Sequence, residues 1–248
     1  MIAAGGDGTV HEVANGLLSS GRTDVVFSVM PIGSMNDYAA ALGFDTHMAR
    51  HGRRPATETF LVDVGVARAG GRERFFVNGL GIGFNGIVTI ESRKIRRLRG
   101  LPLYTLALFQ AMIRHFAHPV WETRLDDRVI QSPSLALSVN LGTREGGFRV
   151  TPRANLADGW FDYLYATNLA RWELLRFVPA LLTGTVPENH PRIHSGRCRI
   201  ASVVSETPLC VHTDGELLCV PEDQIHEVSM ELLPGRLRVE AVRVSGHA

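Results

Sequence analysis

The sequence predicts two architectures in succession, an α/β unit followed by a β-rich unit. Over residues 1–60, apolar segments with strand character alternate with helical patterns, and this rhythm is typical of a parallel sheet with helices on its faces. From about Phe60 onward, short strand-like runs are divided by glycine turns, which favours a β-sandwich or a related antiparallel fold. We therefore expect an α/β domain over residues 1–60 and a β-rich, sandwich-like domain over residues 61–234.

The α/β unit should begin with a short strand that ends at Ala4, followed by a helix over about residues 10–18. A second strand is expected over 24–31, and then a turn and a helix over 36–42. Ligands of parallel sheets bind beyond the carboxyl ends of the strands. The turns that follow the two strands should therefore lie in one crevice.

The β-rich unit should contain short strands and two helical segments. The strands are expected at 61–67, 74–79, 134–141, 160–166, 198–204, 209–213 and 227–233, and the helical segments at 86–116 and 169–182. A last strand over 237–244 could join the edge of either domain, and in the first case residues 235–248 would return to the first one.

Composition excludes several classes of protein. With 45% hydrophobic and 21% charged residues, the 248-residue chain is typical of a soluble globular protein, and a net charge of +1 argues against nucleic-acid binding. The cysteines, Cys198, Cys210 and Cys219, form no C-x-x-C pair, which argues against a disulfide framework or a zinc site and favours a cytoplasmic location. The longest mostly apolar run, residues 101–113, is too short to span a bilayer.

A glycine-rich turn follows the first strand and carries the strongest functional signal. Its residues are Gly5, Gly6, Asp7, Gly8 and Thr9. Glycines let backbone N–H groups approach a ligand, and the helix that follows points its positive end at the same place, so the turn suits phosphate. A tight loop that needs positive φ angles would explain the same residues.

A second turn, which includes Gly33, Ser34, Asn36 and Asp37, follows the next strand. Two such turns on adjacent strands predict a nucleoside triphosphate site. Asp7 and Asp37 would then hold Mg²⁺, which prefers oxygen ligands and usually keeps several waters. The alternative is that Asp37 caps a helix and Asp7 stabilises its own turn.

These residues resemble the catalytic domain of the diacylglycerol kinase family, which is shared by soluble bacterial lipid kinases and sphingosine kinases. The match starts in residues 5–16, continues in 31–37 and 63–65, and extends to 81–84, 146–152, 158–162 and 214–216. The first motif alone would also fit NAD kinases and phosphofructokinases, whereas the later Asp-Gly and Asp-Gly-Glu elements favour lipid kinases.

The resemblance implies ATP- and Mg²⁺-dependent phosphorylation of a lipid hydroxyl in phospholipid metabolism, with diacylglycerol as the first candidate and a sphingoid lipid as the second. It implies a truncated three-layer α/β ATP-binding domain and a lipid-binding domain with the active site between them. It assigns ATP contacts to Gly5, Gly6, Asp7, Gly8, Thr9, Val10, His11, Gly33, Ser34 and Asn36, the Mg²⁺ network to Asp7, Asp37 and Asp63, and the general base to Glu216. Without the resemblance, Asp214-Gly215-Glu216 would be interpreted as a hairpin turn.

The resemblance also implies a second metal site, with the carboxylate of Asp158 and backbone carbonyls near Asn155 and Trp160 as ligands. A simple turn at Asp158-Gly159 is the alternative.

Three departures from the family pattern are Ser34 in place of threonine, His11 in place of asparagine and Asn85 in place of aspartate. The first two resemble sphingosine kinases, so the identity of the lipid stays open.

A basic cluster at residues 93–99 precedes an apolar stretch at 101–109. It predicts peripheral contact with an anionic membrane, and a core helix with a solvated basic lead-in is the alternative because Pro102 divides the two parts.

Family members carry about two further strand–helix units before the first motif, so we expect Met1 either to lie inside a longer protein or to begin a degraded kinase. A soluble-substrate kinase related to NAD kinase and a non-catalytic lipid-binding module remain alternatives, and a homodimer is compatible with the sequence.

Overall fold

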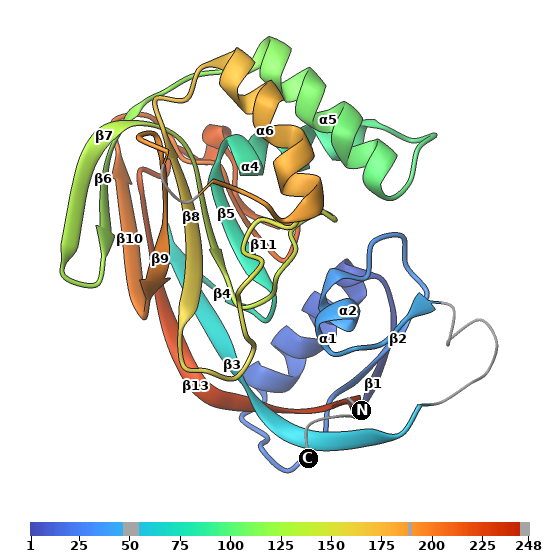
Figure 1. The fold of residues 1–248 in the computed structure, drawn as a ribbon. Helices are drawn as coiled ribbons and strands as arrows, with labels where there is room; N and C mark the ends of the chain where they lie inside the picture. The colour runs from blue at the N-terminus through green and yellow to red at the C-terminus, as the bar shows by residue number, and fades with distance from the viewer. Residues whose placement is uncertain (47–54, 188–189, 244–248) are drawn as a thin grey trace.

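The computed structural model describes residues 1–46, 55–187 and 190–243 (Figure 1). The chain begins with a short α/β region, as the sequence predicts. Strand β1 (Ile2–Gly5) pairs in parallel with β2 (Ser28–Pro31), and the helices α1 (Asp7–Ser19) and α2 (Asp37–Ala41) follow them. Helix α1 buries residues at helical spacing, among them Val10, Ala14 and Leu17, because this apolar stripe faces the core.

The rest of the chain forms a large antiparallel sheet that is nearly closed, in agreement with the predicted sandwich-like fold. Its strand order is β12-β11-β5-β7-β6-β10-β13-β3-β4, and β8 and β9 branch from β7. The strands are β3 (Thr57–Ala69), β4 (Arg72–Phe76), β5 (Gly79–Gly83), β6 (Val120–Leu125), β7 (Arg128–Asn140), β8 (Phe161–Thr167), β9 (Ile193–Cys198), β10 (Ile200–Ser205), β11 (Val211–Thr213), β12 (Glu216–Cys219) and β13 (Glu227–Val242), with a 3-10 turn, η1 (Pro221–Asp223), before the last.

The long ribbon of β3 and β13 connects the two parts of the fold. The strands expected at 227–233 and 237–244 are one strand, β13, which continues through a bulge between Leu233 and Leu237. Gly235 has a φ of 55° in that bulge, a conformation that glycine adopts without strain. The far end of β13 reaches the first sheet, where the Phe27 N–H donates to the Arg238 carbonyl at 2.8 Å. Residue 244 of the expected last strand, and residues 245–248 of the segment expected to return to the first domain, lie outside the described residues.

The helical segment expected at 86–116 is two helices, α4 (Phe84–Lys94) and α5 (Leu101–Arg114). Ile95 leaves helical geometry, Gly100 has a φ of 65°, and Pro102 occupies the first turn of α5, where its missing N–H costs nothing. The strands β5, β6, β9 and β12 were not expected as separate strands; the one expected at 74–79 corresponds to β4 and ends where β5 begins. None of the described helices is both long and apolar enough to cross a membrane.

Helices α4, α5 and α6 (Arg171–Thr183) gather over one face of the large sheet, apart from the α/β region (Figure 1). Between them and the sheet lies a second apolar cluster, which includes Phe84, Leu108, Leu135, Phe148 and Leu174. The main core is continuous from the α/β region, where it contains Phe27, into the large sheet, where it contains Val64 and Trp121. This arrangement leaves a space between the three helices and the α/β region.

Candidate active site

The two glycine-bearing turns lie against each other. A Cβ atom at Gly33 would stand 2.2 Å from the Cα of Gly6, so these two backbones approach more closely than any side chain allows. The N–H groups of Ile32 and Gly33 both donate to the Gly5 carbonyl at 3.2 Å. Asn36 adopts a left-handed conformation and closes the second turn by exchanging hydrogen bonds with Gly33. The structure thus places both turns at one edge of the β1–β2 sheet.

Asp7 and Asp37 come together at this edge. Asp7 begins α1 and accepts hydrogen bonds from the backbone of Asn36 at 2.9 Å and of Tyr38 at 3.3 Å. Asp37 is buried; its Oδ2 accepts a hydrogen bond from the Gly147 N–H at 3.0 Å, and its Oδ1 has no partner among the described residues. Burial, followed by the negative charge of Asp7, raises the pKa of Asp37 to about 6.

The pKa of Asp7 is also raised, chiefly by burial, although the backbone hydrogen bonds from Tyr38 and Asn36 oppose the shift. A pair of neighbouring carboxylates, half-buried at Asp7 and buried at Asp37, with an unpartnered oxygen on Asp37, is the donor set that a hard divalent cation would relieve. Among the described residues, no group of three or more His, Cys, Asp or Glu side chains could hold a metal. A cation at this pair would therefore complete its shell with water or with ligand oxygens.

The Asp-Gly-Glu turn lies beside the first glycine turn. Asp214 has a φ of 51° and accepts hydrogen bonds from the backbone of Val77, Asn78 and Gly79, so it holds this turn against the start of β5. A Cβ at Gly8 would stand 2.9 Å from the Oε1 of Glu216, which places the Glu216 carboxylate directly over the start of α1.

His11 and Arg93 fix the other side of this turn. The buried His11 contacts Asp214 through Nδ1 at 3.0 Å. Burial lowers the pKa of His11, but the hydrogen bond and the charge of Asp214 outweigh burial and raise the pKa overall. The second oxygen of Glu216 pairs with Arg93 of α4 at 2.6 Å, and both side chains are partly exposed.

Asp63 and the second predicted metal site lie elsewhere. Both Asp63 oxygens already accept backbone hydrogen bonds, from Gly159 at 2.7 Å and Gly235 at 2.8 Å, and Asp63 does not line the cavity described below. Its role in a Mg²⁺ network stays a prediction. Asp158 accepts a hydrogen bond from the Trp160 N–H and pairs with Arg197 at 3.4 Å, while Asn155 accepts one from Ala157. This is the geometry of a turn, and metal binding there also stays a prediction.

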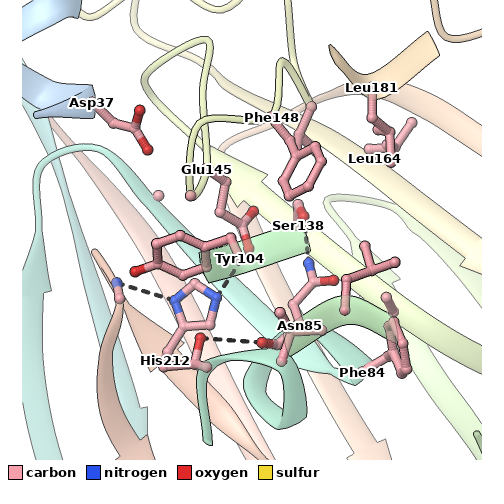
Figure 2. A pocket seen from close by; sticks show the side chains of 18 of the residues that line it. Asp37, Phe84, Asn85, Tyr104, Ser138, Glu145, Phe148, Leu164, Leu181 and His212 are labelled. Carbon is pink, nitrogen blue, oxygen red and sulfur yellow. Dashed lines mark hydrogen bonds and ion pairs between the residues drawn. The ribbon is translucent and has the colours of Figure 1, made fainter. Parts of the chain in front are cut away.

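A single cavity extends from the Asp7–Asp37 pair into the space under the three helices (Figure 2). Its first part is lined by polar groups, including Asp214, Asn78 and the Glu145–His212 pair. Its far part is apolar and is lined by Phe84, Val88, Leu108, Leu135, Phe148, Val150, Leu164, Leu169, Leu174, Phe177, Leu181, Val186 and Ile193. Of the predicted nucleotide contacts, Val10 lines the cavity, and Ser34 lies beside Gly100 in the linker between α4 and α5.

Several lining residues were not identified from the sequence. The ring of Tyr104 packs over Gly146, and burial, followed by the charges of Asp7 and Asp37, raises its pKa to about 12. Glu145 and His212 form a pair at 2.9 Å. Asn85, which the sequence marks only as a departure from the family pattern, donates to Ser138 at 2.7 Å. No local pattern in the sequence marks Tyr104, Glu145 or His212 as part of a site.

Both parts of the chain have relatives among known proteins. The diacylglycerol kinase catalytic domain matches residues 1–64, and the YegS C-terminal NAD kinase beta sandwich-like domain matches residues 79–241. Diacylglycerol kinases of Staphylococcus saprophyticus and Bacillus subtilis are each 28% identical to the chain, over 87% of it and 70% of their own length. The diacylglycerol kinase of Mycobacterium tuberculosis is 26% identical over 94% of the chain and 75% of its length.

The fold has the same relatives. The crystal structure of a diacylglycerol kinase from Bacillus anthracis superposes with a TM-score of 0.64 at 20% identity, over 96% of this chain and 74% of that one. Both the α/β region with its glycine turns and the large sheet that follows it thus have counterparts in these relatives. The chain belongs to the diacylglycerol kinase catalytic-domain family, among the bacterial diacylglycerol kinase homologues that carry a YegS-type C-terminal domain.

Proposed function

We propose that this protein is a lipid kinase that transfers the γ-phosphoryl group of ATP to a lipid hydroxyl. The observation that carries the proposal is the cavity that joins the carboxylate pair Asp7 and Asp37 to an apolar tunnel under α4, α5 and α6. A soluble acceptor would not need that tunnel, whereas an acyl chain would occupy it and leave its polar head near the carboxylates.

Two features support ATP and Mg²⁺ as cofactors. Helix α1 begins inside the Gly5–Gly8 turn, so the N–H groups of its first turn lie at this turn. The N-cap residue, Gly6, has no side chain to cap them, which suits a phosphate group. Asp7 and Asp37 would hold Mg²⁺, because Asp37 Oδ1 is buried without a partner. When bound, the cation would offset negative charge on the phosphates.

Glu216 is the group that supports acceptor activation best. It lies beside Gly8, and its neighbour Gly215 lines the cavity, so its carboxylate faces the place where a phosphate and a hydroxyl would meet. A carboxylate there can orient the hydroxyl and accept its proton. Arg93 pairs with Glu216 in this structure, and the acceptor hydroxyl would have to compete with that exposed ion pair.

The experiment is a phosphorylation assay with labelled ATP, Mg²⁺ and lipids in mixed micelles. Glu216→Gln should reduce turnover strongly while nucleotide affinity stays nearly intact, and Asp7→Asn should weaken the use of Mg·ATP as well. The matched control is Glu222→Gln, a change of the same size in η1. Phosphorylation of NAD but not of lipid, or a failure to bind ATP even with Mg²⁺, would overturn the proposal, and equal turnover of Glu216→Gln and the parent would remove Glu216 from the base role.

Diacylglycerol is the acceptor for which the relatives are named, and a sphingoid lipid is the other candidate. Peripheral contact with a membrane is part of the same proposal. The exposed side of α5 carries Leu106, Phe109 and Ile113 at helical spacing, while Leu108 and Met112 face the core, so the helix is apolar on both sides. On α6, Trp172 and Leu175 are exposed too.

This surface continues into the basic linker at residues 95–100, which suits an anionic lipid surface. The double variant Arg96→Glu with Arg97→Glu should lose binding to vesicles that contain an anionic lipid and keep its thermal stability. Arg22→Glu, in the exposed loop after α1, is the control that should bind as the parent does. Unchanged vesicle binding by the double variant would exclude the linker as the contact.

A further inference from the structure

Glu145 places a carboxylate in the middle of the cavity, between the predicted reaction centre and the apolar tunnel. It lies in the loop between β7 and β8, and Figure 2 shows it between Asp37 and His212. Gly147 of the same loop donates its N–H to Asp37. Two residues of main chain reach at most about 7 Å, so Glu145 is within the span of a lipid head group that contacts Asp37.

The hydrogen bonds of His212 leave one oxygen of Glu145 for another donor. The Gly215 N–H donates to His212 Nδ1 at 3.3 Å, so Nδ1 is occupied as an acceptor. His212 Nε2 therefore carries a proton, which it donates to Glu145 Oε1 at 2.9 Å. The imidazole thus contacts Oε1, and Oε2 is the oxygen left for a further donor.

The second oxygen of Glu145 has no hydrogen-bond partner among the described residues, although it is buried. Burial raises the pKa of Glu145, but the hydrogen bond from His212, the electrostatic attraction of His212 and the nearby donors of Ser138 and Asn140 outweigh burial and lower the pKa overall, so the group is ionised at neutral pH. An ionised oxygen without a donor is costly in a protein interior. A ligand that brings a donor to Oε2 would recover that cost.

We propose that Glu145 determines substrate specificity by accepting a hydrogen bond, through Oε2, from a second donor of the lipid head, a hydroxyl or an ammonium close to the hydroxyl that is phosphorylated. The inference rests on the proposed lipid kinase function and deepens it. Diacylglycerol has no second donor, and its ester oxygens would face the Glu145 carboxylate. The preferred acceptors are therefore lipids with two head-group donors, and diacylglycerol is the poorer substrate.

The test measures kcat/KM for three lipids in the same mixed micelles: monooleoylglycerol with a second hydroxyl, sphinganine with an ammonium, and dioleoylglycerol with neither. The key variant is Glu145→Gln, which keeps the size and an acceptor for His212 but offers an N–H group at the Oε2 position. Glu145→Leu is a second variant that removes all polar character. Leu164→Met, which conserves volume at the apolar end of the cavity, is the control and should change all three lipids alike.

We expect the parent to prefer monooleoylglycerol or sphinganine, and Glu145→Gln to lower kcat/KM for the preferred lipid by about 10- to 100-fold, as loss of a hydrogen bond to a charged group predicts. The value for dioleoylglycerol should stay the same or rise. Because sphinganine also carries a second hydroxyl, losses for both lipids identify the donor as a hydroxyl, and a loss confined to sphinganine identifies it as the ammonium. Equal losses for all three lipids, or a parent that prefers dioleoylglycerol, would overturn the inference while the kinase function stands; a parent that phosphorylates no lipid would overturn both.

Discussion

Asp214 accepts a hydrogen bond from His11 Nδ1 at 3.0 Å, although the two residues are 203 positions apart in the chain. The contact ties the turn that carries Glu216 to the helix that begins with Asp7. The same aspartate also accepts hydrogen bonds from the backbone at the start of β5. The relative positions of Asp7 and Glu216 therefore depend on this one buried pair.

A double-mutant cycle measures that dependence. His11→Ala and Asp214→Asn should each lower the free energy of unfolding, and the double variant should lose less than the sum, with a coupling of about 1–3 kcal/mol. The measurement is urea unfolding. Losses that add to within about 0.5 kcal/mol would contradict the coupling.

The coupling should also depend on pH. Because the folded-state pKa of His11 lies above its ordinary value, the stabilisation from His11 is fully present below the ordinary pKa and is lost as pH rises through the folded-state pKa. We therefore expect a larger coupling at pH 6 than at pH 9. A larger coupling energy at pH 9 than at pH 6 would contradict the raised pKa of His11.

The variant Asp37→Asn should stabilise the protein at alkaline pH in the absence of Mg²⁺. The pKa of Asp37 is about 6 in the folded state against an ordinary 3.8, so its ionisation is more costly in the folded state. The cost is absent below pH 3.8, develops between 3.8 and 6, and persists above, where it amounts to about 3 kcal/mol. Unfolding of parent and variant should therefore differ at pH 8 and coincide near pH 4.

Two controls accompany that comparison. Asp24→Asn removes an exposed carboxylate whose pKa is lowered by Arg22, so this change should not stabilise the protein at pH 8. Added Mg²⁺ with nucleotide should stabilise the parent more than Asp37→Asn. A difference between parent and Asp37→Asn that is equal at pH 4 and pH 8 would contradict the assignment.

The approach of the two glycine turns predicts opposite effects for two Gly→Ala changes. At Gly33 a methyl group would overlap the Gly6 backbone, so Gly33→Ala should cost about 1–3 kcal/mol or more and raise KM for ATP. At Gly16, inside α1, nothing lies within 4 Å of the new Cβ, and Gly16→Ala should stabilise the helix by about 0.5–1 kcal/mol. Thermal unfolding and ATP kinetics of both variants check this, and similar behaviour of the two would contradict the packing.

The sequence predicted the parts of the site that depend on local chemistry. The turns at Gly5–Gly8 and at Gly33 and Asn36 require glycine or a left-handed asparagine at particular positions. A few consecutive residues are enough to predict such a turn. The prediction of one helical segment over 86–116 was wrong. Apolar residues occur on both sides of the basic linker, but the backbone leaves helical geometry there, and a new helix begins after Gly100 with Pro102 in its first turn.

The parts that depend on strand register could not be predicted. His212 pairs with Gly81 across β11 and β5, and the absent side chain of Gly81 leaves room for His212 and Glu145. A shift of one residue would turn His212 to the opposite face. Neither the register nor the loop that carries Glu145 has a signal in the local sequence, so the pair emerges only from the folded chain.

Asp63 provides the remaining prediction, because its two predicted roles have different consequences. The structure gives it a structural role, since it holds the Gly159 turn and the Gly235 bulge through backbone hydrogen bonds. Asp63→Asn would present an N–H group to one of those donors and should lower the free energy of unfolding by about 1–3 kcal/mol. Asp126→Asn is the matched control, because the exposed Asp126 also accepts two backbone hydrogen bonds, from Arg199 and Ile200, and has a left-handed backbone that asparagine tolerates. A smaller loss is expected there, since both hydrogen bonds of Asp126 use one oxygen, Oδ1, and the asparagine amide keeps an oxygen at that place. If Asp63→Asn instead leaves stability unchanged and weakens the dependence of activity on Mg²⁺, Asp63 belongs to the cation network with Asp7 and Asp37, and the β3–β13 ribbon must move toward the glycine turns when Mg·ATP binds.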